Sequence, residues 1–314
     1  MSVGGRASSR AVLLSTLLCC VVATAGDTAP HKKVCIAEGV ASAPYNSLAG
    51  FKLALSSHPD FIETDLQLSK DGVLVCIHDP FLEGVTDVEK VFPYRFATIE
   101  RDGKSTRTWY VNDFTLDELR KLDIGSSFDA AFKGERLPTF QELIDLVRGK
   151  AGLYPELKDP DFYRARGLDI AKALNDLLAH NGLATRDGQK DTPIVVQSFD
   201  AAILKEMRQL GGRNYTLIQL VWFSQWSDYM SNEGLDRVAA YADGIGPVLS
   251  LVLPPETSRI YEAHKRGLQV HAWTAHEAMP PARFKSVTEY EAYLLSELGV
   301  DGLFTTRPDL FPRL

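Results

Sequence analysis

The feature that most constrains the fold is a regular alternation of short apolar segments with amphipathic ones. Eight apolar segments have the length of buried strands: residues 33–37, 61–66, 153–157, 194–198, 215–220, 243–245, 269–273 and 302–305. Seven segments between them repeat apolar residues at the period of a helix: 48–56, 140–147, 168–180, 201–210, 235–241, 257–266 and 287–298. This order predicts an α/β fold, a (β/α)8 TIM barrel. An open doubly wound sheet is the alternative, because periodicity does not show closure, although no glycine-rich phosphate loop follows any strand.

One long interval, from residue 69 to residue 138, interrupts this alternation. Lys70-Asp71-Gly72 has the composition of a turn, and an alternating strand pattern follows it. The second strand is therefore expected to run past the barrel and return as a hairpin, which places His78 near Glu63. The residues beyond, about 79–138, are predicted to form a small subdomain inserted over the barrel mouth, since structureless loops of this length are rare in compact domains.

The first 25 residues are expected to lie outside the fold. Arg6 and Arg10 precede an uncharged run from Ala11 to Ala25 that ends in small residues, which is the arrangement of a secretory signal peptide. A transmembrane anchor is the alternative, but this run falls short of the roughly 20 residues that span a bilayer. Cleavage near Ala25 predicts a secreted or periplasmic protein of residues 26–314 with no stable membrane anchor.

Charge and cysteine content narrow the possible partners and compartments. The chain has 34 Lys+Arg against 41 Asp+Glu, a net charge of −7, and this balance argues against a nucleic-acid partner, which requires a basic surface. Residues 26–314 keep two of the four cysteines, Cys35 and Cys76. Both lie in predicted strands, where they either pair in an oxidising compartment or remain separate buried thiols.

Three carboxylates are predicted to converge at the barrel mouth. Glu63 and Asp65 are two residues apart near the end of a strand and so share a face, and Glu156 and Lys158 repeat this spacing on the next barrel strand. Carboxylates this close repel one another, and a divalent cation removes the repulsion. All-oxygen ligands favour Mg²⁺ or Ca²⁺. Two alternatives remain: ion pairs with Lys158 or with arginines, and a metal-free glycosidase pair of Glu63 and Glu156, beside which Lys158 is poorly explained.

Several motifs resemble those of the glycerophosphodiester phosphodiesterase family. Residues 61–79, FIETDLQLSKDGVLVCIHD, look like its central signature. Further matches follow in family order: YPELK at 154–158, VQSF at 196–199, ADGIGP at 242–247, VHAWT at 270–274 and VDGLF at 300–304. The resemblance spans about residues 33–312 and implies a TIM barrel with an insertion after the second barrel strand.

The resemblance also implies a reaction and roles for individual residues. The reaction is metal-dependent hydrolysis of a small-molecule glycerophosphodiester to glycerol 3-phosphate and an alcohol, as part of lipid and glycerol metabolism. The implied roles are metal binding for Glu63, Asp65 and Glu156, phosphate binding for Lys158, acid/base catalysis for His78, and a place in the substrate pocket for Trp273.

The end of the first strand departs from the family pattern. The family has His-Arg-Gly there and then Pro-Glu-Asn-Thr, whereas this chain has AEGV at 37–40, PYNS at 44–47, and a loop about two residues shorter. Glu38 therefore stands in place of the first catalytic His, and Gly39 in place of the phosphate-binding Arg. Glu38 is our candidate for the missing base. It is alternatively a fourth metal ligand, or the site has fallen out of use, which predicts a catalytically impaired member that binds metal and phosphodiester without turnover.

For three aromatic residues and one histidine, the sequence indicates a functional role less strongly. His271 shares the inward parity of Trp273 but lies one layer deeper, which favours a hydrogen-bonded core histidine. Trp222, Phe223 and Trp226 follow the fifth barrel strand. They are expected either to form a wall of the pocket or to pack beneath the insertion.

Overall fold

The computed structural model describes residues 1, 33–101, 103–278 and 280–313. The signal-peptide prediction falls on residues 1–25, and all of these except Met1 lie outside the described ranges, as does the cleavage site near Ala25. Among the described residues, none of the helices combines the length and the apolar character that a membrane crossing requires.

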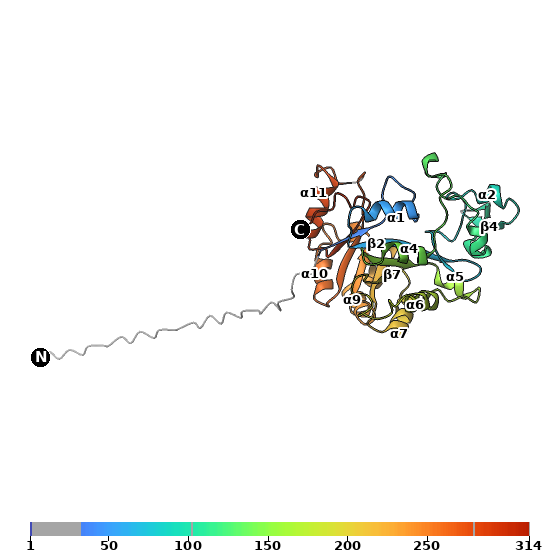
Figure 1. The fold of residues 1–314 in the computed structure, drawn as a ribbon. Coiled ribbons are helices and arrows are strands. Elements are labelled where there is room, and N and C mark those ends of the chain that lie inside the picture. The colour runs from blue at the N-terminus through green and yellow to red at the C-terminus, as the bar shows by residue number, and fades with distance from the viewer. Residues whose placement is uncertain (2–32, 102, 279, 314) are drawn as a thin grey trace. The chain divides into compact units, whose positions relative to one another are not determined.

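Eight parallel strands close into a barrel, as the alternation predicts (Figure 1). In ring order they are β1 (Val34–Ala37), β2 (Phe61–Leu68), β6 (Gly152–Leu157), β7 (Val195–Ser198), β8 (Thr216–Val221), β9 (Gly244–Pro247), β10 (Gln269–Ala275) and β11 (Gly302–Thr305). The ring closes because β1 pairs with both β11 and β2, the latter in the register Ile36↔Phe61 and Ala37↔Ile62. An open sheet would leave β1 at an edge, so the doubly wound alternative is wrong.

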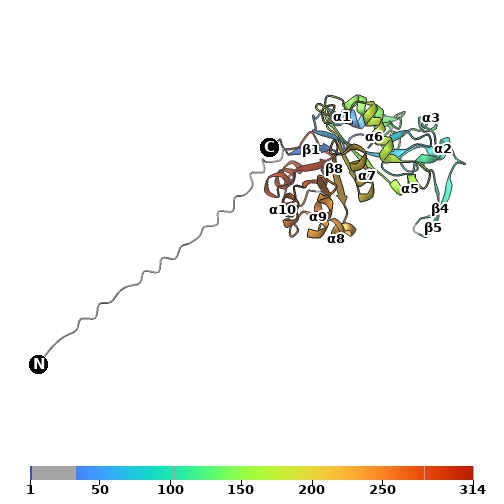
Figure 2. The same ribbon diagram turned by 90° about the horizontal axis from the view of Figure 1, so that it is seen from below.

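Helices cover the outside of this barrel (Figures 1 and 2). The longer ones match the predicted helices within a few residues: α1 (Leu48–Leu55), α4 (Phe140–Val147), α6 (Ile170–His180), α7 (Ala201–Gly211), α9 (Asn232–Ala239), α10 (Ser258–His264) and α11 (Val287–Ala292), which continues as a π-helix over Tyr293–Glu297. Two short helices, α5 (Pro160–Arg164) and α8 (Trp226–Tyr229), follow β6 and β8 and are not predicted. Apolar side chains of the helices and strands form the main core, for example Leu143, Leu174 and Leu204.

The second barrel strand runs past the barrel and returns, as the turn residues predict. The returning strand β3 (Leu74–Cys76) is antiparallel to β2, with Leu66 opposite Cys76. The backbone N–H of Ile77 donates to the carbonyl oxygen of Asp65 at 3.1 Å. This register sets His78 opposite Thr64, one residue from the place expected from the sequence.

The segment after this hairpin builds a hydrophobic cluster of its own. It contains α2 (Val88–Val91), the hairpin of β4 (Ala97–Arg101) and β5 (Lys104–Thr108), α3 (Leu116–Leu119) and two 3-10 turns, Val111–Asp113 and Ala130–Phe132. Leu82, Trp109 and Phe114 pack there against Val75 and Ile77 of the returning chain. In both ribbon views this segment lies on the side of the barrel away from α10 (Figures 1 and 2).

Cys35 and Cys76 are separate thiols, and both are fully buried. Burial raises the pKa of each thiol to about 12. Of the two possibilities that the sequence leaves open, the structure therefore has the unpaired one, and neither cysteine is a thiolate at neutral pH.

Candidate active site

The candidate active site is a pocket of about 370 Å³ at the carboxyl ends of the barrel strands. Its lining consists of Glu38, Tyr45, Glu63, Asp65, His78, Glu156, Lys158, Gln197, Phe199, Leu220, Trp222, Trp273 and Phe304. All seven residues that the sequence singles out for the site are among them: Glu38, Glu63, Asp65, His78, Glu156, Lys158 and Trp273. Parallel strands of a closed barrel end at one face, which is why residues more than 200 positions apart meet here.

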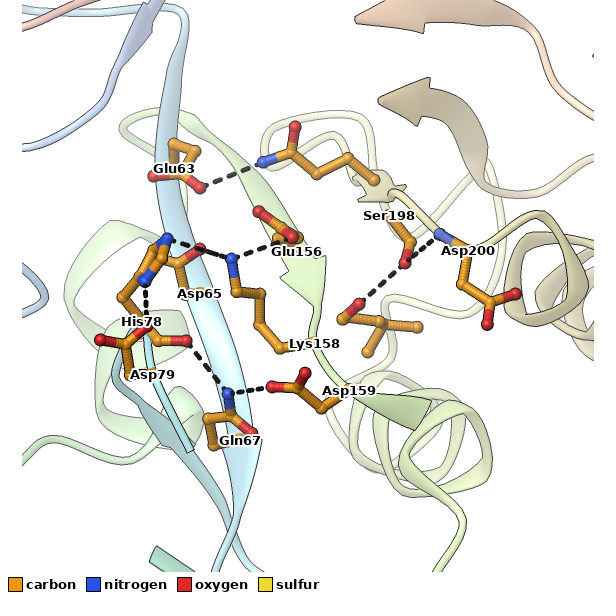
Figure 3. Close-up of polar contacts among 12 residues, drawn as sticks. Glu63, Asp65, Gln67, His78, Asp79, Glu156, Lys158, Asp159, Ser198 and Asp200 are labelled. Carbon is orange, nitrogen blue, oxygen red and sulfur yellow. Dashed lines mark hydrogen bonds and ion pairs between the residues drawn. The ribbon is translucent and has the colours of Figure 1, made fainter. Parts of the chain in front are cut away.

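Glu63, Asp65 and Glu156 form the acidic centre of the pocket (Figure 3). Asp65 and Glu156 are register partners on β2 and β6, and Glu63 lies two residues before Asp65 on the same face. All three are buried, and one carboxylate oxygen of each lies within 4.8 Å of the others. Burial raises the pKa of Glu63 well above its usual range and that of Glu156 to about 8, and the charge of Asp65 adds to both shifts. Converging oxygen donors whose ionisation is so disfavoured fit a hard divalent cation.

Donors from neighbouring elements hold two of these carboxylates in place. Tyr45 Oη donates to Glu63 Oε2 at 2.8 Å, and Gln197 Nε2 donates to Glu63 Oε1 at 3.0 Å. Asn46 Nδ2 donates to Asp65 Oδ2 at 2.9 Å. Outer hydrogen bonds of this kind orient carboxylates for metal binding. The sequence pattern predicts none of these three donors, although Tyr45 and Asn46 follow the first strand and Gln197 lies in the VQSF motif.

Lys158 lies between the acidic centre and His78 (Figure 3). Its Nζ is 3.1 Å from Glu156 Oε1, 3.4 Å from Asp65 Oδ1 and 3.2 Å from His78 Nε2. Burial by itself would lower the pKa of Lys158, but the Glu156 and Asp65 charges outweigh it and raise that pKa, so the ammonium stays charged. The ion pairs that the sequence offers as an alternative to metal binding are thus present. Lys158 is nevertheless the one Lys or Arg among the described lining residues, and a single ammonium does not balance three ionised carboxylates.

His78 is positioned by partners on both ring nitrogens. Its Nδ1 is 2.8 Å from Asp79 Oδ1, and its Nε2 faces the ammonium of Lys158. An ammonium only donates hydrogen bonds, so Nε2 of the neutral ring is the acceptor and the Nδ1 hydrogen points to Asp79. His78 therefore presents Nε2 to the pocket.

Glu38, which the resemblance aligns with a family histidine, directly follows β1 at its carboxyl end. Its backbone N–H donates to the carbonyl oxygen of Thr305 at 3.2 Å, and its carboxylate accepts a hydrogen bond from the hydroxyl of Thr274. Burial, with a contribution from the charge of Asp65, raises the pKa of Glu38 to about 7. Glu38 is not part of the group of carboxylates whose oxygens converge, which favours a base over a fourth metal ligand.

The ring of Tyr45 fills the space that a longer side chain at position 39 would need. Gly39 has a φ of +72°, and a Cβ on it would lie 2.7 Å from Tyr45 Cδ2. Only glycine accommodates both the backbone angle and the close ring. The two departures from the family pattern are therefore linked: Tyr45 covers Gly39 with its ring and holds Glu63 with its hydroxyl.

Aromatic side chains form the opposite wall. Trp273 and Trp222 are stacked, with ring centroids 5.3 Å apart and an angle of 21° between the planes, and Phe199 meets Trp273 edge-on at 5.7 Å. Trp273 Nε1 donates to the carbonyl oxygen of Gly246 at 2.7 Å, which fixes its ring. Trp222 is 45% exposed and lies at the rim. The pocket therefore has an acidic half and an aromatic half.

The remaining candidates lie outside the pocket lining. Phe223 packs edge-on against Trp222, and Trp226 packs against the main core. The sequence places Trp222, Phe223 and Trp226 either in a wall of the pocket or beneath the insertion. Of the three, only Trp222 lines the pocket. His271 is buried, with its Nδ1 2.9 Å from Tyr154 Oη, as expected for a core histidine.

A family model and several curated proteins match this chain. The model described as the glycerophosphoryl diester phosphodiesterase family matches residues 39–310. A glycerophosphodiester phosphodiesterase of Haemophilus influenzae is 31% identical over 88% of each chain. One from Bacillus subtilis is 30% identical over 86% of this chain and 82% of its own.

Solved structures show the same fold at lower identity. A glycerophosphodiester phosphodiesterase of Agrobacterium tumefaciens superposes with a TM-score of 0.64 at 24% identity, over 89% of this chain and 98% of that one. A phosphodiesterase of Oleispira antarctica, solved with the product sn-glycerol-3-phosphate, has a TM-score of 0.65 at 22% identity, over 88% and 94%. At these identities the likeness bears on the fold alone.

Proposed function

The chain belongs to the glycerophosphoryl diester phosphodiesterase family, and from this premise we propose that it hydrolyses glycerophosphodiesters to glycerol 3-phosphate and an alcohol. The observation that carries the proposal is the convergence of three buried carboxylates, Lys158 and His78 in one pocket. The curated relatives are named as phosphodiesterases, which gives the impaired alternative no support and argues against a glycosidase pair of Glu63 and Glu156.

The acidic centre is proposed to hold one divalent cation through Glu63, Asp65 and Glu156. Their buried, converging oxygens suit Mg²⁺ and Ca²⁺ alike. When bound, the cation supplies Lewis-acid chemistry: it polarises the phosphate and lowers the pKa of an attacking hydroxyl group.

Lys158 and the aromatic wall are proposed to position the substrate. The Lys158 ammonium lies at the edge of the acidic centre, where it binds the phosphate and balances the negative charge that develops there. The stacked Trp273 and Trp222 offer an apolar face to the glycerol carbons. The phosphorus is thereby placed between the acidic and aromatic halves.

Glu38 and His78 are proposed to move the two protons of the reaction. Glu38 accepts the proton of the nucleophile, which is water or the neighbouring hydroxyl of the substrate, as its oxygen bonds to phosphorus. The bond from phosphorus to the alcohol oxygen breaks, and His78, which takes up a proton on Nε2 once the Lys158 ammonium turns to the phosphate, gives that proton to the alcohol oxygen. Where the nucleophile is the substrate hydroxyl, water then attacks the cyclic phosphate: neutral His78 takes the proton of the water, the bond from phosphorus to that hydroxyl oxygen breaks, and protonated Glu38 returns the proton to it. Where the nucleophile is water, Glu38 afterwards releases its proton to solvent and His78 takes one up.

The test is release of glycerol 3-phosphate from glycerophosphocholine, with Mg²⁺ or Ca²⁺ and with a chelator. We expect turnover that the chelator abolishes, and a loss of at least about 100-fold in Glu63→Gln. Asp161→Asn, on the exposed surface of α5, is the control and retains activity. Absence of product from several such diesters in the presence of cation would contradict the proposal, and calorimetric binding of a diester without turnover would favour the impaired alternative.

We further propose that residues 1–25 direct export, on the strength of their sequence alone. The expected product begins near Gly26 and is recovered from the medium or the periplasm. Mass spectrometry of the purified chain measures its first residue. Recovery of an uncleaved chain from the cytoplasm would contradict export.

A further inference from the structure

A second pocket, of about 270 Å³, adjoins the candidate active site at Tyr45 and His78. Its lining comes from three segments: the loop after β1 (Pro44, Tyr45, Asn46), the end of the returning chain (Cys76, Ile77, His78, Asp79) and the insertion (Gly84, Val85, Ile124, Ser127, Phe128, Leu137). Tyr45 and His78 line both pockets. Asp79, which lines only the second, lies on the side of His78 away from Lys158 (Figure 3). His78 therefore separates the acidic centre from the second pocket.

The wall of this second pocket is mainly apolar. Val85 and Phe128, on two loops of the insertion, are 46% and 47% exposed, while Ile124 and Leu137 behind them are buried. The described lining residues include no Lys or Arg, and their one carboxylate, Asp79, is bonded to His78 Nδ1. Exposed apolar side chains gathered in a hollow beside a reactive site mark a surface for an apolar ligand group.

Hydrogen bonds between the two loops preform this wall. Ser127 Oγ donates to the carbonyl oxygen of Val85 at 3.0 Å. Asp87 and Asp123 are joined twice: the Asp87 N–H donates to the Asp123 carbonyl at 3.2 Å, and the Asp123 N–H to Asp87 Oδ1 at 2.8 Å. The apolar side chains are thus held in place before a ligand arrives, which reduces the entropic cost of binding.

The position of His78 decides which substrate group enters this pocket. In the proposed reaction His78 protonates the leaving alcohol, so that alcohol oxygen must lie within hydrogen-bond reach of Nε2. In the proposed reaction the glycerol lies against Trp273 and Trp222. The carbons of the alcohol must then extend past His78, toward Val85 and Phe128.

A third pocket, of about 620 Å³, also meets the active site but suits the alcohol less well. It is lined by Glu156, Lys158 and Phe199 together with Asp159 and Asp200, and His78 is not part of its lining. An alcohol placed there would have Lys158, which the proposed reaction assigns to the phosphate, beside its oxygen in place of His78, so the pocket at Val85 and Phe128 is favoured.

We propose that the pocket between the β1 loop, the end of the returning chain and the insertion is the alcohol subsite, and that it takes an uncharged alkyl or aryl group. This inference rests on the proposed phosphodiesterase function and adds a substrate class to it. The preferred substrates are glycerophosphodiesters of apolar alcohols, and those of ammonium-bearing alcohols are poorer.

The test compares kcat/KM for the hexanol and ethanolamine diesters of glycerol phosphate. We expect the wild type to favour the hexanol diester about tenfold or more. Phe128→Ser lowers kcat/KM for the hexanol diester about tenfold and leaves the ethanolamine diester within about twofold. Val85→Asp, which adds a carboxylate at an exposed position, reverses the preference. Tyr94→Ser is the control, because Tyr94 is 91% exposed in the same insertion and lines none of the three pockets.

The outcomes separate this inference from the proposed function. Equal kcat/KM for the two diesters, or a Phe128→Ser variant that lowers both alike, would overturn the subsite while leaving the phosphodiesterase proposal intact. Turnover of neither diester would contradict the proposed function instead. Calorimetric binding of the hexanol diester then tests the subsite: Phe128→Ser must weaken it about tenfold and Tyr94→Ser must not.

Discussion

At the scale of single residues, Glu38 is the substitution with the largest chemical consequence. At the position that the resemblance aligns with a histidine base, this chain has a carboxylate whose pKa burial raises to about 7. A base works only when deprotonated, so kcat/KM of the wild type is expected to fall as the pH drops below about 7. Glu38→Gln is expected to lower kcat by about 10²–10⁴-fold and to remove this pH dependence.

Steady-state kinetics over pH 5–9 at saturating cation measure both effects. The matched control is Glu100→Gln, which changes an exposed glutamate on β4 and leaves the profile unaltered. A Glu38→Gln enzyme with wild-type kcat would show that the proton of the nucleophile goes elsewhere.

The second prediction at the residue scale concerns Tyr45. Tyr45→Phe keeps the ring over Gly39 but removes the hydroxyl that donates to Glu63 at 2.8 Å. Affinity for the divalent cation is expected to weaken about tenfold, because Glu63 loses one of the bonds that orient it. Calorimetric titration with Mg²⁺ and Ca²⁺ measures the change, and Tyr261→Phe, on the surface of α10, is the control. Unchanged affinity would mean that Gln197 alone orients Glu63.

The pocket residues differ in how far the sequence predicts them. Glu63, Asp65 and Glu156 are predictable because strand parity alone directs them inward. Tyr45 and Gln197 are not, because each acts through a hydrogen bond to Glu63 from another element, 18 and 134 residues away. Their roles depend on three-dimensional neighbours that spacing within a strand does not reveal.

At the scale of elements, the loop after β1 is adapted to its own sequence. Gly39→Arg, which introduces the arginine that the resemblance aligns with this position, brings both an unfavourable φ and a Cβ contact of 2.7 Å with the Tyr45 ring. We expect it to lower the free energy of unfolding by about 2–4 kcal/mol. Gly267→Arg separates the two causes, because Gly267 has a φ of +73° but open space around its Cβ position. This variant is therefore expected to lower the free energy of unfolding by less than Gly39→Arg does.

Chemical denaturation of the two variants measures this difference. Gly39→Arg combined with Tyr45→Ala is expected to recover the part of the loss that comes from the ring contact. Equal losses in the two single variants would contradict the linkage between Gly39 and Tyr45.

The insertion shows where element prediction from sequence ends. Its extent follows from the long gap in the alternation, but α2, α3, β4 and β5 are each only four or five residues long. Segments this short span about one helical turn or two strand repeats, which is too little to define a period. The long barrel helices and the β2–β3 hairpin, by contrast, carry several repeats or a specific turn, and their bounds are predicted within a few residues.

At the scale of the whole molecule, the acidic centre couples stability to pH and to cation. The raised pKa values of Glu63 and Glu156, the latter about 8, mean that the folded protein without cation holds protons that the unfolded chain releases near pH 4.3. The contribution of these groups to stability is therefore present below about pH 4.3 and is lost as the pH rises toward about 8. A divalent cation, which takes the place of the protons, is expected to raise Tm more at pH 8 than at pH 5.

Thermal unfolding with and without Mg²⁺ or Ca²⁺ at the two pH values measures this coupling. Glu63→Gln is expected to lose most of the cation-induced rise in Tm. An equal rise at pH 5 and pH 8 would indicate that the cation binds elsewhere.

Lys33 and Arg313, near the two ends of the described segment that forms the barrel, lie at the face of the barrel opposite the pocket. Lys33 Nζ donates to the carbonyl oxygen of Val300 at 2.7 Å, just before β11, and Arg313 pairs with Asp60 at 3.2 Å, just before β2. These contacts mark the amino ends of the strands, whereas the acidic centre, His78 and the pocket at Val85 and Phe128 belong to the carboxyl ends and the insertion. If the protein is immobilised on a bead or a sensor chip through residue 33 or residue 313, the mouth of the barrel and its pocket therefore face the solution.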